Sequence, residues 1–223
     1  MPTKMKILIA VIVVLFATII FVYIAGGFAM TSVKLPQPQT NSTFPLDQAL
    51  KERRSVRDFQ IKELTGEQIS TLLWAADGIS DVKNGFRTAP SPGALYPIDL
   101  YLVKSDGLWL YNPAHNALKL VKTGDLRIEL SKAALNQTVV ATAPVDVVLV
   151  ADLDRIKPKY SERSLQFCYL EAGHIAQNLA LEAVALNLAS VPVGGFVEVQ
   201  ANKLLALSSS QTVLYILPVG VKK

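Results

Sequence analysis

The sequence predicts one folded domain of the α+β or α/β class behind an apolar N-terminal segment. Segments with β-branched or alternating patterns are interspersed with segments of three- and four-residue periodicity, which is typical of mixed folds. The 223 residues suffice for a membrane segment and one ordinary domain, since domains cluster at ~100–200 residues. We therefore expect residues 1–33 to be a membrane anchor or signal segment, 34–43 a linker and 44–223 the folded domain.

The N-terminal segment is long enough to cross a membrane. Ile7 to Ile24 is almost unbroken apolar sequence, and at 1.5 Å per residue it can span a ~30 Å hydrocarbon core. Lys4 and Lys6 precede it, which favours a single-pass protein with a cytoplasmic N-terminus and an extracytoplasmic domain. A cleaved signal peptide followed by secretion is the alternative, because small residues at Gly27 and Ala29 offer a cleavage site.

The segment from Lys34 to Thr43 is polar and contains two prolines, which favours an extended tether. After it, Leu46 to Arg53 is typical of a short helix. Thr65 and Gln68 form the pattern of a capping box that opens a second helix, which we expect to continue through Ala76.

The middle of the chain favours strands. We expect them over Ile98–Val103, Leu108–Tyr111 and Leu118–Val121, separated by turn residues. A helix over Leu126–Asn136 then leads to Val145–Val150, whose β-branched run is typical of a strand buried on both faces.

The last part of the chain favours a long helix over Ser161–Asn187, a short helix over Asn202–Leu207 and a final strand over Val213–Leu217 before Pro218. Its apolar positions recur at Leu165, Cys168, Ala172, Ile175, Leu179 and Ala183. Further apolar residues widen this arc, which suggests that the helix is covered on more than one side, as at a subunit interface.

Composition excludes several classes of function. The first 39 residues contain Lys4, Lys6 and Lys34 and no acidic residue. The remainder of the chain therefore has 19 of the 22 basic residues and all 18 acidic ones. A nearly neutral domain does not favour nucleic-acid binding. Cys168 is the only cysteine, and His115 and His174 lie far apart, so the sequence offers no internal disulfide and no metal-ligand pattern.

Three short segments carry the candidate chemistry. In the basic segment, Arg53–Arg57, alternation in an extended chain would turn Arg53, Ser55 and Arg57 to one side. Two guanidinium groups and a hydroxyl suit a phosphate, because arginine forks bind two oxygens at once. A solvated basic turn at the end of a helix is the alternative interpretation.

The other two segments offer main-chain groups. Pro90–Pro97 is a loop with rigid prolines around Gly93, which would hold backbone amides in place or simply lead into a helix. The Gly-Gly segment, Val191–Phe196, lacks side chains at Gly194 and Gly195, where a flat ring could approach the main chain.

Taken in this order, the three segments resemble the nitroreductase-like FMN-dependent oxidoreductases, and specifically their SagB-type dehydrogenase branch, which includes azoline oxidases. The resemblance spans Leu50 to Gly220 and includes Glu171-Ala172-Gly173-His174. It implies an α+β nitroreductase-like fold with a central, mainly antiparallel sheet surrounded by helices. It also implies a homodimer with FMN at the subunit interface.

The resemblance assigns roles to individual residues. Arg53, Ser55 and Arg57 would hold the FMN phosphate and ribityl chain, while Pro90, Ser91, Gly93, Pro192, Gly194 and Gly195 would border the isoalloxazine. Lys159 and Tyr160 match a pair that azoline-oxidising members use in proton abstraction, although a surface pair at a helix start is the alternative. Relatives often end in a basic tail that reaches the phosphate, whereas this chain offers Lys222 and Lys223.

The sequence thus predicts a flavoprotein that transfers hydride through flavin N5 to or from a small organic or peptide substrate. It leaves open whether NAD(P)H or a quinol donates electrons. A membrane-tethered flavin-binding module without turnover of its own is the alternative.

Overall fold

A computed structural model describes residues 31–223 of the chain. The apolar run expected to cross a membrane lies outside these residues. Among the residues that are described, no helix is both long enough and apolar enough to span a bilayer.

A seven-stranded sheet forms the centre of the domain, in the order β1-β6-β5-β4-β7-β9-β8, and every neighbouring pair is antiparallel. Its strands are β1 (Ser32–Lys34), β4 (Ile98–Lys104), β5 (Gly107–Asn112), β6 (Ala117–Thr123), β7 (Val145–Asp152), β8 (Leu188–Ser190) and β9 (Gln211–Val221). A separate hairpin joins β2 (Ile79–Asp81) to β3 (Phe86–Arg87). The predicted antiparallel α+β architecture is confirmed.

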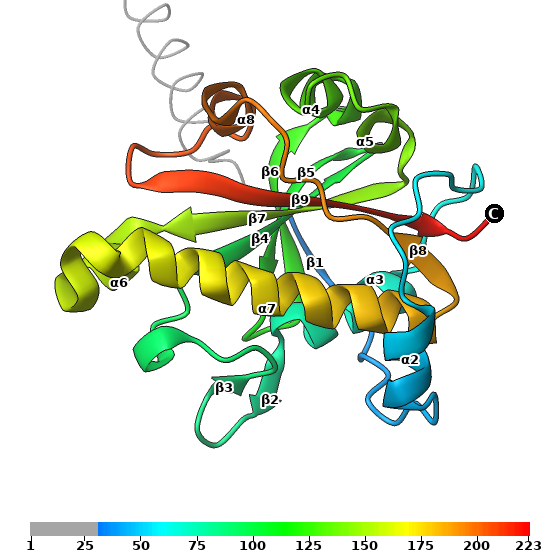
Figure 1. Cartoon of the computed structure of the whole chain (residues 1–223), viewed down its shortest axis with the longest axis horizontal. Coiled ribbons are helices and arrows are strands. Elements are labelled where there is room, and N and C mark those ends of the chain that lie inside the picture. Colours follow the sequence, from blue (N-terminus) through cyan, green and yellow to red (C-terminus); the bar gives the residue numbers. More distant parts are fainter. Residues whose placement is uncertain (1–30) are drawn as a thin grey trace, which may run out of the picture. The chain divides into compact units, whose positions relative to one another are not determined.

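Helices cover both faces of this sheet (Figure 1). They are α2 (Leu46–Glu52), α3 (Gly66–Asp77), α4 (Arg127–Ala133), α5 (Thr138–Thr142), α6 (Leu153–Tyr160), α7 (Ser164–Ala185) and α8 (Glu198–Leu204), with short 3-10 turns at Pro92–Ala94 and Ser161–Arg163. Alternate residues of β7 point to opposite faces, so Val147 joins the core under α3 and α7 while Val148 joins the core under α4, α5 and α8. The strand is buried on both sides, as its sequence predicts.

Most predicted elements occur within a few residues of their expected bounds. The Thr65 hydroxyl accepts a hydrogen bond from the Gln68 backbone amide, and the Gln68 side-chain oxygen accepts one from the Thr65 backbone amide, so the capping box is complete. The long helix α7 buries its expected stripe except for Leu165, which is 37% exposed. Residues 161–163 form a 3-10 turn, so that α7 begins only at Ser164 and Leu165 lies in its first turn. The short helix expected at Asn202 begins four residues earlier, at Glu198.

The prediction that the last strand ends before Pro218 is wrong, because β9 continues to Val221. The Pro218 carbonyl accepts a hydrogen bond from the Val191 amide, so the polar edge of Pro218 faces away from β7. In a strand the N–H and C=O of one residue point to the same side. The missing N–H of Pro218 therefore removes no bond from the ladder with β7, and the strand passes through the proline.

Part of the expected linker is attached to the domain. Residues 32–34 form β1, which pairs with β6, and Leu35 is buried. The Pro36 carbonyl accepts hydrogen bonds from Ser70 and Asn116, and the Gln39 amide donates to Thr71. The polar composition of this segment does not anticipate these contacts, because each joins it to residues more than thirty positions away.

Candidate functional site

The basic segment lies beside the end of β8, which leads directly into the Gly-Gly segment. Ser55 forms a parallel bridge with Ser190, and the Val56 amide donates to the Ser190 carbonyl at 3.1 Å. Two residues later the chain reaches Pro192, and Val193 is fixed to β9 by reciprocal hydrogen bonds with Ile216. Residues more than 130 positions apart are thereby held in one place.

The side chains expected to bind phosphate have no partners in the described part of the chain. Within residues 31–223, Arg53, Ser55 and Arg57 take part in no side-chain hydrogen bond or ion pair, and Ser55 and Arg57 are exposed. Arg54 behaves differently, because its guanidinium donates to the carbonyls of Lys51 and Arg53. The three side chains that alternation groups together are thus the ones available to an anion.

The Gly-Gly segment offers free amides. Gly194 and Gly195 are exposed, and neither amide donates a hydrogen bond to any group in the described part of the chain. A Cβ on either residue would meet only side-chain atoms at 3.7–3.8 Å, so the surface there is open. The Gly195 carbonyl accepts a hydrogen bond from the side-chain amide of Gln137, which orients this main chain.

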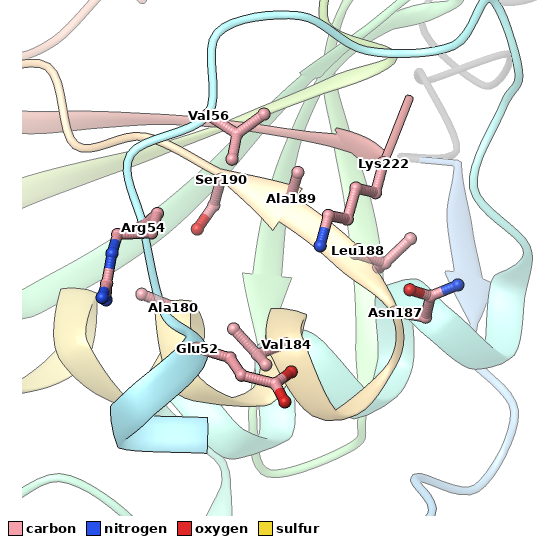
Figure 2. Close-up of a pocket in the computed structure, with 10 residues that line it drawn as sticks. All are labelled: Glu52, Arg54, Val56, Ala180, Val184, Asn187, Leu188, Ala189, Ser190 and Lys222. Carbon is pink, nitrogen blue, oxygen red and sulfur yellow. The ribbon is translucent and has the colours of Figure 1, made fainter. Parts of the chain in front are cut away.

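The C-terminal lysines contact the residues directly after the basic segment. Phe59 bridges to Lys222, and the Lys223 ammonium lies 3.0 Å from the Asp58 carboxylate. Figure 2 shows a small cavity between the end of α2, β8 and the end of β9, with Arg54 and Lys222 at its rim. Arg53, Ser55 and Arg57 do not line this cavity, so it is not the space that their side chains would share with a phosphate.

The Pro90–Pro97 loop has an unusual backbone. Gly93, Ala94 and Tyr96 all have positive φ angles, of 64°, 53° and 48°. Such conformations cost on the order of 1 kcal/mol for a residue other than glycine, and they cluster at functional sites. Pro90 is exposed at the start of the loop, and Ser91 behind it is partly buried.

Lys159 and Tyr160 lie directly over this loop. A Cβ placed on Gly93 would come within 2.6 Å of the Lys159 Nζ atom and 3.0 Å of the Tyr160 hydroxyl. Gly93 therefore makes room for both side chains, in addition to supplying its left-handed backbone. The structure brings together the expected catalytic pair and one of the expected cofactor-binding segments.

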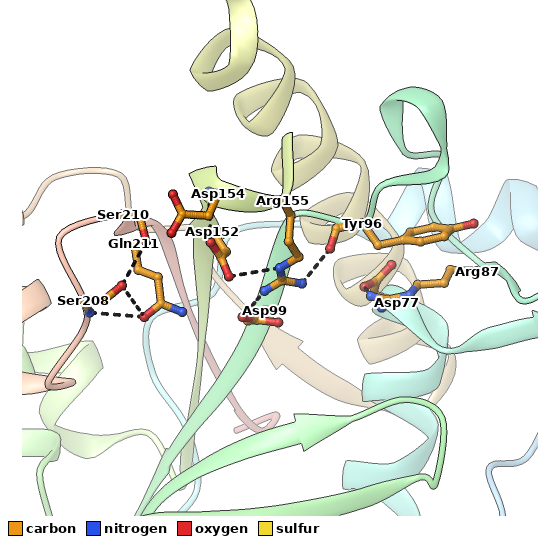
Figure 3. A network of polar contacts seen from close by, with 10 residues as sticks. All are labelled: Asp77, Arg87, Tyr96, Asp99, Asp152, Asp154, Arg155, Ser208, Ser210 and Gln211. Carbon is orange, nitrogen blue, oxygen red and sulfur yellow. Dashed lines mark hydrogen bonds and ion pairs between the residues drawn. The ribbon is translucent and has the colours of Figure 1, made fainter. Parts of the chain in front are cut away.

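Arg155 connects the helix that carries Lys159 and Tyr160 to the Pro90–Pro97 loop. It lies on α6 one turn before Lys159, and its guanidinium donates to the Tyr96 carbonyl at 2.8 Å and pairs with Asp99 and Asp152 (Figure 3). It thereby connects α6, the loop and β4. Sequence reasoning missed this residue because its partner Asp99 lies 56 positions away.

Two buried carboxyls lie behind the loop. Asp77 pairs with Arg87, whose guanidinium also stacks 4.5 Å from the centre of the Tyr96 ring. Glu171 accepts a hydrogen bond from the Ser91 hydroxyl at 2.6 Å. Burial raises the pKa of Asp77 to about 7 against the opposing effect of Arg87, and burial likewise raises the pKa of Glu171 to about 7. Sequence reasoning missed both roles, although an acidic residue on the apolar stripe of α7 was a usable signal.

Comparison with known proteins decides the family. The model of the family described as "Nitroreductase family" matches residues 50–221, which is most of the chain. The chain belongs to the nitroreductase family. This membership supports an oxidoreductase activity that uses a flavin, and it agrees with the segments described above.

Individual nitroreductase relatives agree in fold. A protein of Methanocaldococcus jannaschii that is provisionally named a nitroreductase is 34% identical over 183 residues, which cover 79% of this chain and 91% of the relative. A crystal structure of a Ralstonia eutropha protein, also provisionally named a nitroreductase, superposes with a TM-score of 0.80 at 31% identity and covers 88% of this chain and 92% of the other.

A third similar structure is the Escherichia coli microcin synthetase McbBCD complex, solved with truncated pro-MccB17 bound. It has a TM-score of 0.67 at 22% identity and covers 78% of this chain and 73% of the other. At that identity the likeness shows the shared nitroreductase fold alone.

The predicted site residues of this nitroreductase-family chain fall into two groups. One contains the basic segment and the Gly-Gly segment, and the other contains the Pro90–Pro97 loop with Lys159 and Tyr160. Across the described residues no hydrogen bond or ion pair links a side chain of one group to the other. Each group is held internally by the fold.

Proposed function

We propose that the chain is an FMN-dependent oxidoreductase that transfers hydride to or from a small organic or peptide substrate. Two observations on the described residues carry this proposal: Arg53, Ser55 and Arg57 have unpartnered side-chain donors, and Gly194 and Gly195 have free amides. The two segments are connected through the bridge between Ser55 and Ser190. Cations and a hydroxyl suit the phosphate, and exposed main-chain donors suit the polar edge of a flat ring. FMN carries both parts, so the residues fit this cofactor.

The bound cofactor would supply hydride transfer, and the protein supplies binding, orientation and protons. The two arginines would hold the phosphate, and Ser55 would complete its shell of donors. The glycine amides are fixed by the Val193–Ile216 hydrogen bonds, so they can orient the ring without a further loss of main-chain freedom.

We further propose that the active form is a homodimer with FMN at the subunit interface. The support is the separation of the site into two groups together with exposed apolar residues on α7, where Leu165, Tyr169 and Leu170 are 37–54% exposed. Exposed apolar residues on a helix whose other face is buried in the core favour a protein partner. Sedimentation of the purified chain tests this proposal, and a monomer that retains FMN would contradict it.

Lys159 and Tyr160 support a SagB-type reaction, because both lie over Gly93 with polar ends toward the loop. We expect Lys159→Ala to retain FMN and to lower the rate of substrate oxidation by roughly 10²-fold or more, since general acid–base groups contribute this much. Flavin absorbance measures binding, and stopped-flow reduction by the substrate measures the rate. An unchanged rate with bound FMN would remove Lys159 from the mechanism.

The proposal as a whole is tested by the colour of the protein. We expect the purified full chain to show a flavin spectrum and to be bleached anaerobically by NADH, NADPH or a quinol. Reoxidation by an added acceptor would complete a turnover. A chain that binds FMN and is reduced by none of these donors would favour the alternative of a flavin-binding module without its own turnover, and a chain that takes up no FMN would contradict both.

A further inference from the structure

Glu171 is a buried residue with a carboxyl group, and it has no role in the reaction proposed above. It lies in the middle of α7 with 1% of its surface exposed. One carboxyl oxygen, Oε2, accepts the hydrogen bond from Ser91. The other, Oε1, is buried and has no hydrogen-bond partner among the residues that the structure describes. A buried carboxylate with an unsatisfied oxygen is costly, so this site favours a group that can take up a proton.

The protonation state of Glu171 determines which hydrogen bonds Ser91 can offer to a ligand. A serine hydroxyl has one proton and two lone pairs. The Tyr96 amide donates to the Ser91 Oγ atom at 2.9 Å and occupies one lone pair. When Glu171 is ionised, the hydroxyl proton points to Oε2, and Ser91 offers a ligand only a lone pair. When Glu171 carries a proton on Oε2, it donates to Ser91, and the hydroxyl proton is free to point to a ligand.

We propose that Glu171 is a positioning residue that determines, by its protonation, whether Ser91 donates or accepts a hydrogen bond toward the flavin. The proposal rests on the proposed function, because it requires FMN to bind beside the Pro90–Pro97 loop. The oxidised isoalloxazine edge has several acceptor atoms and one N–H donor. The donating form of Ser91 therefore suits it better, so protonation of Glu171 tightens the binding of FMN.

The charges around Glu171 support proton exchange near neutrality. Asp77 from α3 opposes ionisation of Glu171, whereas Arg87 from β3 and Arg155 from α6 favour it. Burial outweighs the hydrogen bond from Ser91 and the two cations and, with Asp77, raises the pKa of Glu171 to about 7. Cys168 lies one turn earlier on α7, and burial, with a contribution from Glu171, raises the pKa of its thiol to about 11, so it remains uncharged.

The test compares FMN binding by the purified full chain at about pH 6 and about pH 8, using quenching of flavin fluorescence. The FMN phosphate itself titrates near pH 6, and this contribution is common to all variants. For each variant we therefore take the ratio of the Kd at about pH 8 to the Kd at about pH 6. The readout is the wild-type ratio divided by the ratio for Glu171→Gln. We expect wild type to gain roughly three- to tenfold in affinity at the lower pH over this variant, the factor that one hydrogen bond supplies.

Two further variants complete the test. Ser91→Ala should lose the same pH-dependent component, because Glu171 then has no hydroxyl to reorient, and this variant decides the matter if Glu171→Gln does not fold. Glu182→Gln is the matched control: Glu182 lies on the same helix, and burial raises its carboxyl pKa, but the cavity that it lines includes neither Ser91 nor Glu171. It should behave as wild type.

Infrared spectroscopy reports the proton directly. In wild type, the C=O band of protonated carboxyls should weaken as the pH rises through about 7. In Glu171→Gln, the part of this decrease that comes from Glu171 should be absent. An equal Kd ratio in wild type and Glu171→Gln, or an infrared titration that the substitution leaves unchanged, would overturn the proposal while leaving FMN binding intact. Failure of wild type to bind FMN at either pH would instead overturn the proposed function and, with it, this inference.

Discussion

Replacing Arg53 and Arg57 together with alanine should abolish stable FMN binding. Both guanidinium groups lack partners in the described part of the protein, so a phosphate would gain their hydrogen bonds without breaking others. Each hydrogen bond to a charged group contributes ~1.5–3 kcal/mol, and the loss of two corresponds to a Kd roughly 10²- to 10⁴-fold higher. Titration of the flavin-free chain with FMN measures this change.

Arg54→Ala is the matched control for this experiment. Arg54 has the same charge and stands between the two, but its guanidinium is bonded to the carbonyls of Lys51 and Arg53 and faces the separate cavity in Figure 2. We expect this variant to bind FMN nearly as wild type does. If Arg54→Ala loses the cofactor and the double variant keeps it, the phosphate lies on the opposite side of the segment.

The second large effect should be a gain in stability from Asp146→Asn. Asp146 is fully buried on β7, and neither carboxyl oxygen has a hydrogen-bond partner among the described residues. Burial raises the pKa of this carboxyl well above its ordinary value of 3.8, with Arg127 opposing and Asp125 adding to the shift. Between 3.8 and the raised folded pKa, the folded protein holds a proton that the unfolded chain has released.

The sign of the pH dependence follows from that proton. As pH rises across this interval, wild type loses ~1.4 kcal/mol of unfolding free energy per pH unit relative to the variant, because an amide does not titrate. Below pH 3.8 both states are protonated and this difference vanishes. Urea denaturation at several pH values measures it. The control is Asp154→Asn, at an exposed aspartate on α6, for which we expect no such trend. A gain for Asp146→Asn that is independent of pH would contradict the explanation.

The sequence alone was sufficient for the features that short stretches encode. The capping box at Thr65 depends on two residues three positions apart, and the buried strand around Val147 depends on a run rich in valine. The order of the three motif segments can likewise be read from the sequence, and it was enough to indicate the family. The free side chains of Arg53 and Arg57 follow from the same alternation that separates them from Arg54.

Only the tertiary structure revealed the features that depend on distant partners. The strand at residues 32–34 exists because β6 supplies its hydrogen bonds, and Pro218 is tolerated because its polar edge faces Val191 and not β7. Glu171 is a binding partner of Ser91 across 80 positions, and Asp146 is an unsatisfied carboxyl only because two cores close around β7. Local propensity acts over a few residues, whereas burial and charge at a site depend on what the whole fold packs around it.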